Sequence, residues 1–584
     1  MVLGRLAEGR SLDAARDEMQ AIGAGLQEEF PDFNLGWTVN VVPLKQQVVG
    51  QVRATLWVLL GAVGLLLLIA CANVANLFLV RATQRQREMA VRTSLGASGR
   101  DLAGQLFTES AVLAASGAVL GLLLAYLGTR LLAERVPDAF GIPRMEAAGM
   151  DGTVLIFTMG VTVFTAILFG LLPAAQAAGT SPARTLNAEG RGPSQRSGRV
   201  RNVLVVAEVA LSLVLLAGAA LLGRSMLTLT AVDAGIESEQ VLVGRVNLAG
   251  ETYREAHAKV AFFDELIPRI QALPGTARVG AITFLPMDGM GAATSYWPAE
   301  HPKPPNDERP VADIRNVSGD YFGAMGIEIL RGRSFDDRDR SDGPQTVVVN
   351  RALADAHWPG QNPVGQGVVV MWDDVTPWEV IGVVEDVRLA GLAEEARATI
   401  YMNYAKATYF PWMQLVVRST GAPGTLTPAV RTALREIDST LPLGSVRVME
   451  DIVASSTARP RMTTVLIVIF AGLATLLAAV GLYGVLAYTV SQRVREIGVR
   501  IALGARPGSV MAMVVRQGAG LALVGLAVGL VVALLGGGVM SSLLYEIEPS
   551  DPWALGGAGA LLFGVAIVAC AVPALRASSV PPAE

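Results

Sequence analysis

The stretch TVLIVIFAGLATLLAAVGLYGVLAYTV, residues 464–490, runs without a single charged side chain. About 20 residues in a helix cross a bilayer, and a helix satisfies all of its own backbone hydrogen bonds there. Composition agrees, since 52% of the 584 residues are hydrophobic and only 17% are charged. We therefore predict a polytopic α-helical membrane protein. Its seven predicted spans are 55–80, 105–129, 153–178, 202–223, 463–490, 515–544 and 553–575.

A short polar motif occurs twice between these spans. REMAVRTSLGA stands at 87–97 and REIGVRIALGA at 495–505, which is 408 positions later, with seven of the eleven letters identical. A polar stretch seldom repeats this closely by chance, so the motif indicates an internal repeat. Glycines spaced for close helix packing recur at the same offset: Gly117 and Gly121 opposite Gly525 and Gly529.

Arginine predicts the orientation of the spans. The stretches 81–100 and 176–201 hold five arginines each and 491–510 holds four, whereas YEIEPSD at 545–551 holds three acids and no base. Positively charged loops stay in the cytoplasm. We expect both motif loops and the C-terminus to be cytoplasmic, the region 231–458 to be extracytoplasmic, and the protein to lie in the cytoplasmic (inner) membrane.

The first 54 residues do not fit this topology alone. Seven crossings place them outside, yet they contain no apolar core of a signal peptide. Residues 11–44 share the layout of 427–451, an amphipathic helix and a strand leading into a membrane helix. We therefore expect a preceding helix and most of a first external domain to be missing. The predicted domains are 1–54 (tail of that domain), 55–178 (three helices, with coupling loop 81–100), 179–201 (cytoplasmic linker), 202–230 (first helix of the second repeat), 231–458 (extracytoplasmic domain) and 459–584 (three helices, with coupling loop 491–510).

The region 231–458 has the pattern of a soluble α+β domain. Short β-rich runs at 345–350, 367–372 and 378–387 alternate with a helical run at 253–273, separated by turn residues. About 228 residues suffice for a full hydrophobic core.

No catalytic or metal-binding motif stands out in this domain. The three histidines, His257, His301 and His357, are scattered singly. RGRSFDDRDRSDG at 331–343 lacks the ligand order of a calcium loop. We expect neither a metal nor another cofactor, and no enzyme activity.

A nucleotide site of the phosphate-loop type is excluded by the lysines. Such a loop needs Gly-Lys followed by Ser or Thr. The four lysines, followed by Gln, Val, Pro and Ala, are Lys45, Lys259, Lys303 and Lys406. If the protein uses ATP, another polypeptide hydrolyses it.

Two acids fall within predicted spans, Glu109 and Glu208. An ionisable group in a membrane helix is a candidate functional site, here for a proton relay in a secondary transporter. The alternative places each acid near the cytoplasmic interface, in reach of water or an arginine. Depth favours this alternative, and Gln517 rather than an acid aligns with Glu109.

Each copy of the motif is expected to form a brief helix. Val91 and Leu95, or Val499 and Leu503, lie four apart on one face among charged residues, and a glycine then ends the helix. One interpretation is that the arginines of the motif only set the membrane topology, which would explain the charge. The fixed order of apolar and charged positions in two places favours docking into a groove on a partner.

Together these features resemble the MacB/FtsX-type permeases of ABC transporters, in particular their duplicated form with two four-helix repeats. The resemblance extends to GDYFGAMGIEILRGRSFDDRD (319–339), VVVNRALADAHWPGQNPVGQ (347–366), VIGVVEDVRLAGL (380–392) and VVAEVALSLVLLAGAALLGRSM (205–226). It implies that the motif is the coupling element that meets the ATPase, and that 231–458 is a MacB-type periplasmic core domain. The matching positions are Arg87, Glu88, Val91, Arg92, Leu95, Gly96 and Ala97, and Arg495, Glu496, Val499, Arg500, Leu503, Gly504 and Ala505.

The mechanism implied by the resemblance is mechanotransmission, in which an ATPase subunit in trans moves the membrane helices and these drive the external domain. The expected partners are that ATPase, membrane lipid, and either a periplasmic adaptor with an outer-membrane channel or a wall hydrolase, but no nucleic acid. The leading hypothesis is a non-ATPase permease subunit of an export or mechanotransmission complex. An FtsX-like scaffold that regulates an external partner without transport is the alternative, and an ion- or proton-coupled secondary transporter is the third.

Overall fold

The computed structural model describes residues 3–34, 38–94, 99–135, 149, 151–178, 195–289, 291–305, 308–340, 342–371, 373–503 and 506–578. The chain divides into two compact units. Residues 1–47 and 229–458 form the sheet unit, and residues 48–228 and 459–584 form the helical unit. The predicted linker 179–201 lies outside the described residues up to position 194.

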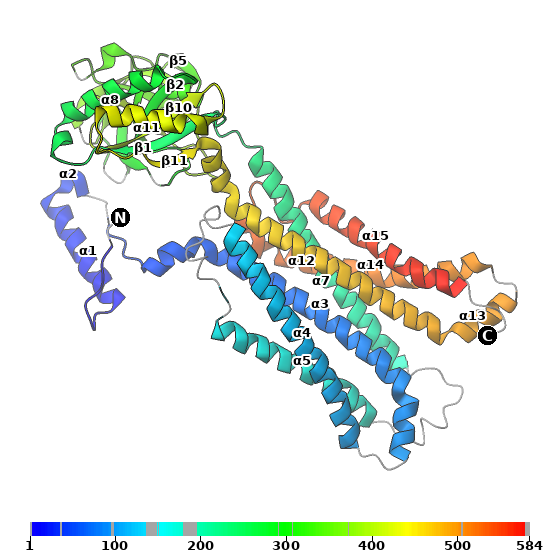
Figure 1. Ribbon diagram of the computed structural model, residues 1–584. Coiled ribbons are helices and arrows are strands. Elements are labelled where there is room, and N and C mark those ends of the chain that lie inside the picture. Colours follow the sequence, from blue (N-terminus) through cyan, green and yellow to red (C-terminus); the bar gives the residue numbers. More distant parts are fainter. Residues whose placement is uncertain are drawn as a thin grey trace. The chain divides into compact units, whose positions relative to one another are not determined.

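The helical unit is built from long apolar helices (Figure 1). They are α3 (Leu44–Ser94), α4 (Gly99–Arg135), α5 (Gly152–Ala178), α7 (Gln195–Thr230), α12 (Met449–Gln492), the short α13 (Val494–Ala502), α14 (Pro507–Met540) and α15 (Pro552–Ser578). A 3-10 turn, η6 (Ser541–Leu543), follows α14.

Each predicted span falls on one of these helices. Six are long and apolar enough to cross a membrane: Arg53–Leu77, Ala111–Arg130, Gly198–Thr230, Met449–Gln492, Pro507–Leu543 and Pro552–Ser578. The remaining prediction, 153–178, falls on α5, whose apolar segment among the described residues is the shorter Gly152–Phe164. The fold class is therefore the predicted one, a helical membrane protein with an α+β domain.

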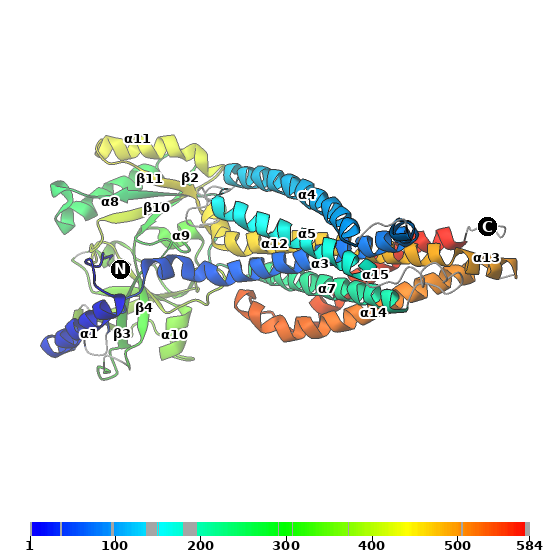
Figure 2. The ribbon, with the colours of Figure 1, turned by 90° about the horizontal axis from the view of Figure 1, so that it is seen from below.

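The helices α3, α7 and α12 run alongside one another (Figures 1 and 2), and their side chains share one core. Its buried members are Ala62, Ile69, Leu215, Ala219, Leu222, Ile467, Ala471 and Ala474. A second core joins α7 and α12 to α13, α14 and α15. α4 packs against α5 and α14 against α15. Small residues are frequent in these contacts because they let helix backbones approach closely.

The sheet unit contains one 11-stranded mixed sheet in the order β11-β1-β10-β2-β4-β3-β7-β8-β6-β9, with β5 paired to β8 and β4 also to β9. β4 with β9 and β6 with β8 are the parallel pairs. The strands are β1 (Val241–Asn247), β2 (Thr276–Ile282), β3 (Ala292–Pro298), β4 (Val311–Gly319), β5 (Ile329–Gly332), β6 (Thr346–Asn350), β7 (Gly367–Val370), β8 (Asp373–Val384), β9 (Thr399–Asn403), β10 (Trp412–Ser419) and β11 (Gly444–Val448). The predicted strands at 345–350, 367–372 and 378–387 are thus confirmed as β6, β7 and β8.

The same unit also contains α-helices and 3-10 turns. They are α1 (Leu12–Glu29), α2 (Pro31–Asn34), η2 (Glu251–Tyr253), α8 (Ala256–Gln271), α9 (Tyr321–Met325), η4 (Asp337–Asp339), α10 (Arg351–His357), η5 (Pro423–Leu426) and α11 (Thr427–Ile437). The helix predicted at 253–273 is confirmed as α8.

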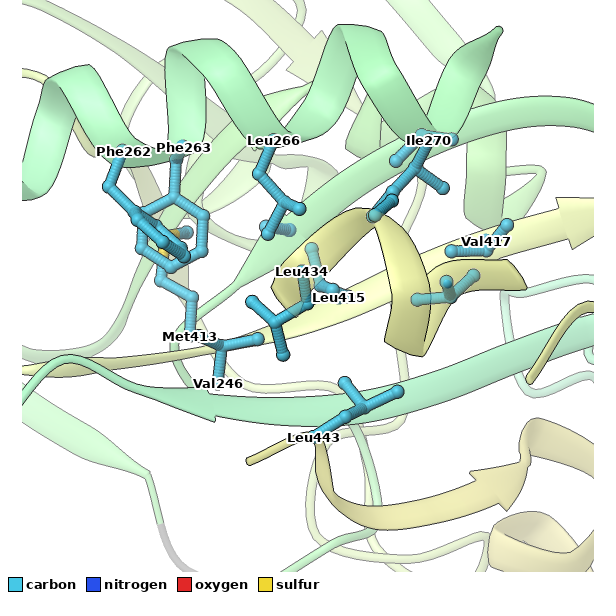
Figure 3. Packing of buried hydrophobic residues seen from close by; sticks show 14 of the residues in the cluster. Val246, Phe262, Phe263, Leu266, Ile270, Met413, Leu415, Val417, Leu434 and Leu443 are labelled. Carbon is cyan, nitrogen blue, oxygen red and sulfur yellow. The ribbon is translucent and has the colours of Figure 1, made fainter. Parts of the chain in front are cut away.

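α8 and α11 bury their apolar faces on β1, β10 and β2. Figure 3 shows Phe263, Leu266 and Ile270 of α8 directed toward Met413, Leu415 and Val417 of β10 and toward Leu434 of α11. The period of the apolar residues in α8 matches one face of a helix, and these side chains are almost fully buried. A second cluster of buried residues in the described part of this domain surrounds Val347, Val349 and Val380.

The N-terminal helix α1 has apolar residues at positions equivalent to buried positions of α11, and these residues are exposed. Ile22 and Leu26 of α1 precede Val430 and Leu434 of α11 by 408 residues, the offset of the repeated motif. Val430 and Leu434 are buried, whereas Ile22 and Leu26 are 49% and 40% exposed. The predicted likeness of the two segments therefore extends to the register of individual apolar side chains.

Candidate coupling site

The second copy of the motif forms the separate helix α13. α12 ends at Gln492, Arg493 interrupts the helix, and α13 runs over Val494–Ala502. Leu503 caps its C-terminal end, and its backbone N–H donates to the carbonyl of Val499. The predicted brief helix is confirmed for this copy, while Gly504 and Ala505 lie outside the described residues.

α13 has two apolar faces rather than the single one expected. Ile497 is 1% exposed and packs in the core shared with Val490, Val510 and Val514. Ile501, one turn later, is partly buried against the same core. Comparison of the two motif copies did not predict this buried contact. The spacing of four residues between Ile497 and Ile501 places both on one helix face and could have indicated it.

The predicted docking face points away from that core. Val499 is 55% exposed and Leu503 is 83% exposed. Next to them, Arg500 Nη2 lies 2.7 Å from Glu496 Oε1, an i,i+4 ion pair whose two side chains are each half exposed. Ile497 packs one face of α13 against the bundle core, and this contact holds the helix in place while the opposite face is exposed.

The first copy differs in its backbone. Residues 87–94 continue α3, which ends at Ser94, so the expectation of a separate brief helix is wrong for this copy. Leu95, Gly96 and Ala97 lie outside the described residues. Nothing is described of the side chains of Arg87, Glu88, Val91 and Arg92, nor of Arg495 in the second copy.

The two glycine pairs lie in different surroundings. A Cβ added to Gly525 would come within 2.7 Å of Val209 Cβ on α7, and one added to Gly529 within 2.7 Å of the Ala210 carbonyl oxygen. Gly117 and Gly121 of α4 have open space at the same position among the described residues. The structure therefore brings only the second pair into a helix contact.

The two acids of the predicted spans also differ. Glu109 is half-buried on α4. Glu208 on α7 is 1% exposed, and neither of its carboxylate oxygens has a hydrogen-bond partner among the described residues. The nearest arginine along α7, Arg201, has its guanidinium 4.3 Å above the ring of Tyr488. Among the described residues no arginine pairs with Glu208, so the expected arginine partner is not found in that part of the chain.

In the sheet unit, the acids of the 331–343 loop engage arginines. Asp339 is fully buried and accepts hydrogen bonds from Arg333, at 3.0 Å between Arg333 Nη2 and Asp339 Oδ1, and from Thr346 Oγ1 at 3.0 Å. His357 Nε2 lies 2.8 Å from the hydroxyl of Tyr296. Within the described residues, no three His, Cys, Asp or Glu side chains gather as a metal site.

Two family models match the chain. The model described as FtsX-like permease C-terminal matches residues 60–182 and again 468–582. The model described as MacB-like periplasmic core domain matches residues 203–437. The first model thus covers both copies of the motif, and the second covers α7 together with most of the sheet unit.

Several known proteins are similar over parts of the chain. The Macrolide export ATP-binding/permease protein MacB of Sodalis glossinidius is 26% identical over 391 residues, which are 62% of this chain and 58% of that protein. The Uncharacterized ABC transporter permease YknZ of Bacillus subtilis is 24% identical over 287 residues, 48% of this chain and 70% of that protein. The Pyoverdine export ATP-binding/permease protein PvdT of Pseudomonas entomophila is 31% identical over 145 residues, 24% of this chain and 21% of that protein.

Among solved structures, the crystal structure of the periplasmic region of MacB from Actinobacillus actinomycetemcomitans is similar to this chain. The match covers 37% of this chain and 92% of the solved chain. It has 16% sequence identity and a TM-score of 0.26.

Proposed function

Because this chain is a MacB/FtsX-type permease, we propose that it is the non-catalytic membrane subunit of an ABC transporter and couples ATP hydrolysis by a partner subunit to movement of its α+β domain. In this proposal it lies in the cytoplasmic membrane, with the motif loops inside and the α+β domain outside. The arginine distribution of the loops supports this orientation.

The exposed face of α13 carries the proposal. Two apolar side chains, Val499 and Leu503, are exposed beside the Glu496–Arg500 ion pair. An apolar stripe with a charged rim is what a helix offers to a groove on a partner. Burial of Ile497 and Ile501 ties α13 to the bundle core, so a force applied to the exposed face reaches α12, α14 and α15 through packed side chains.

The partner supplies the nucleotide site. None of the four lysines of the sequence stands in a phosphate-binding loop. MacB of Sodalis glossinidius is named for both ATP binding and permease function. In this proposal, ATP hydrolysis by a partner subunit drives the permease. The similar proteins named for macrolide and pyoverdine export favour export over a purely regulatory role.

The test is co-purification of an ABC ATPase with the permease from membranes of the native host. The variants are Leu503→Asp and the double variant Arg92→Glu with Arg500→Glu, and the matched control is Ser509→Asp, an exposed position at the start of α14. We expect the wild type and Ser509→Asp to retain ATPase activity and both coupling variants to lose it. Equal retention in all four preparations would show that the motif does not dock the ATPase.

A further inference from the structure

A polar site lies inside the helical unit where α3, α7 and α12 meet. Glu208 of α7 is 1% exposed, and Asn73 of α3 is 7% exposed. Both side chains point at Gly481 of α12: a Cβ built there would overlap Glu208 Oε2 and lie 2.6 Å from Asn73 Oδ1. The missing side chain of Gly481 therefore makes the room that the carboxyl group occupies.

The position of this site follows from the repeat. Asn73 and Gly481 are 408 residues apart, the offset of the two motif copies, so they are equivalent points on α3 and α12. Two further hydrogen bonds join the same three helices. Asn73 Nδ2 donates to the carbonyl of Leu477 at 2.9 Å, and Ser212 Oγ of α7 donates to the carbonyl of Ala474 at 3.0 Å. The carboxyl group thus lies where equivalent helices of the two repeats contact each other.

Among the described residues, the site has hydrogen-bond acceptors but no donor for the Glu208 carboxyl group. The two oxygens of Glu208 have no hydrogen-bond partner among the described residues, and Asn73 turns its amide nitrogen to Leu477 and so leaves its oxygen toward Glu208. A buried acceptor without a donor costs free energy, and an unpaired buried carboxylate costs far more. A proton on the carboxyl group removes the charge and supplies the one donor that the cluster needs.

Other charged or titratable side chains that the structure describes on these helices are not paired with Glu208. Arg201 of α7 stands seven residues before Glu208, about 10 Å along the helix, over the ring of Tyr488 of α12. Tyr483 of α12 accepts a hydrogen bond from Arg576 of α15 at 3.1 Å. Cys71 is the thiol on the same part of α3. None of them is a hydrogen-bond or ion-pair partner of Glu208.

We propose that Glu208, Asn73 and Gly481 form a proton-binding site that joins the two repeats: the carboxylic acid of Glu208 donates its proton to Asn73 Oδ1. Loss of the proton leaves a carboxylate that needs water, and water reaches it only when α3 separates from α7 and α12. The site therefore links the protonation of one residue to the contact between the repeats. This inference does not depend on docking of an ATPase.

The test is infrared spectroscopy of the full chain in lipid nanodiscs at neutral pH. A protonated carboxylic acid has a C=O stretching band, separate from carboxylate and amide bands, that shifts in D₂O. We expect this band in the wild type and its loss in Glu208→Gln, whose amide keeps a donor for Asn73. Glu109→Gln, the matched control at the other acid of a predicted span, should keep the band. Asn73→Leu should shift it, because the acid then loses its acceptor.

Two results would overturn the proposal. One is a difference spectrum between wild type and Glu208→Gln that contains only carboxylate bands, which would show that Glu208 is ionised. The other is an acid band that is unchanged in Asn73→Leu, which would show that the proton is not donated to Asn73. Thermal unfolding of each variant establishes that the spectra come from folded protein.

Discussion

Gly529 of α14 lies directly against Ala210 of α7, so close that a Cβ at position 529 would be 2.7 Å from the Ala210 carbonyl oxygen and 2.9 Å from its Cα. Backbone atoms cannot rotate away as a side chain can. The contact therefore fixes the distance between α7 and α14, and it requires glycine at this position.

The first prediction compares this glycine with its equivalent. We expect Gly529→Ala to destabilise the helical unit by about 1–3 kcal/mol, the usual range for an overpacked contact. Gly121→Ala, 408 residues earlier, should not destabilise it, since the added methyl group meets open space among the described residues and alanine is the better helix former. Thermal unfolding midpoints in one detergent measure both. A similar loss in the two variants would contradict the structural difference.

The second prediction concerns α11 and α1. Leu434 is fully buried beneath α8, so Leu434→Ala should cost about 2–5 kcal/mol through the cavity it leaves. Leu26→Ala at the equivalent position of α1 should change stability by no more than about 0.5 kcal/mol, because Leu26 is 40% exposed. Denaturant titration followed by tryptophan fluorescence reports this, since Trp297, Trp358 and Trp378 are buried in the sheet unit. An equal loss would mean that Leu26 is also packed.

The third prediction is a pH dependence of the sheet unit. Burial by itself would raise the pKa of Asp339, but hydrogen bonds from Arg333, the Asp336 N–H and Thr346 outweigh it, and the pKa is lowered. A lowered folded-state pKa means that the carboxylate stabilises the fold above the ordinary aspartate range, near pH 4, and that this stabilisation disappears as the pH falls through the folded value.

Asp339→Asn should therefore lower stability at neutral pH by about 2–3 kcal/mol, the worth of charged hydrogen bonds, and should flatten the loss of stability below pH ~4. Asp337→Asn is the matched control, because Asp337 in the same loop is 97% exposed. Unfolding curves at a series of pH values test this. If Asp339→Asn loses stability at low pH to the same extent as the wild type, other carboxylates cause that loss.

The fourth prediction tests the space at Gly481. Gly481→Ala should destabilise the wild type, because the new methyl group overlaps the Glu208 carboxyl and crowds Asn73. In a Glu208→Ala background the same change should cost much less. A double-mutant cycle measures this coupling, and contacting residues commonly give about 0.5–3 kcal/mol. Additive effects would place the Glu208 carboxyl away from Gly481.

Several features of this protein were predictable from short-range patterns. Charge-free runs of more than twenty residues marked the membrane helices, and alternating β-rich runs marked β6, β7 and β8. Both rest on local rules, since a backbone in lipid must satisfy its own hydrogen bonds and side chains alternate along a strand. The second motif copy formed its predicted helix for the same reason. The roles of the coupling residues and the domain boundaries stay predictions.

The sequence by itself determined the class of protein, the repeat with its 408-residue offset, and the residues that the two copies share. Only the tertiary structure decided what each equivalent position contacts. Gly529 meets α7 and Gly121 meets no described residue; Leu434 is buried and Leu26 is exposed; Ile497 is buried and Leu503 is exposed. The position of Glu208 along α7 predicted that it lies near the cytoplasmic membrane interface. In the tertiary structure, α3 and α12 pack around it and bury its carboxyl group beside Asn73. Burial depends on neighbours that are distant in sequence, and a residue's own segment does not specify them.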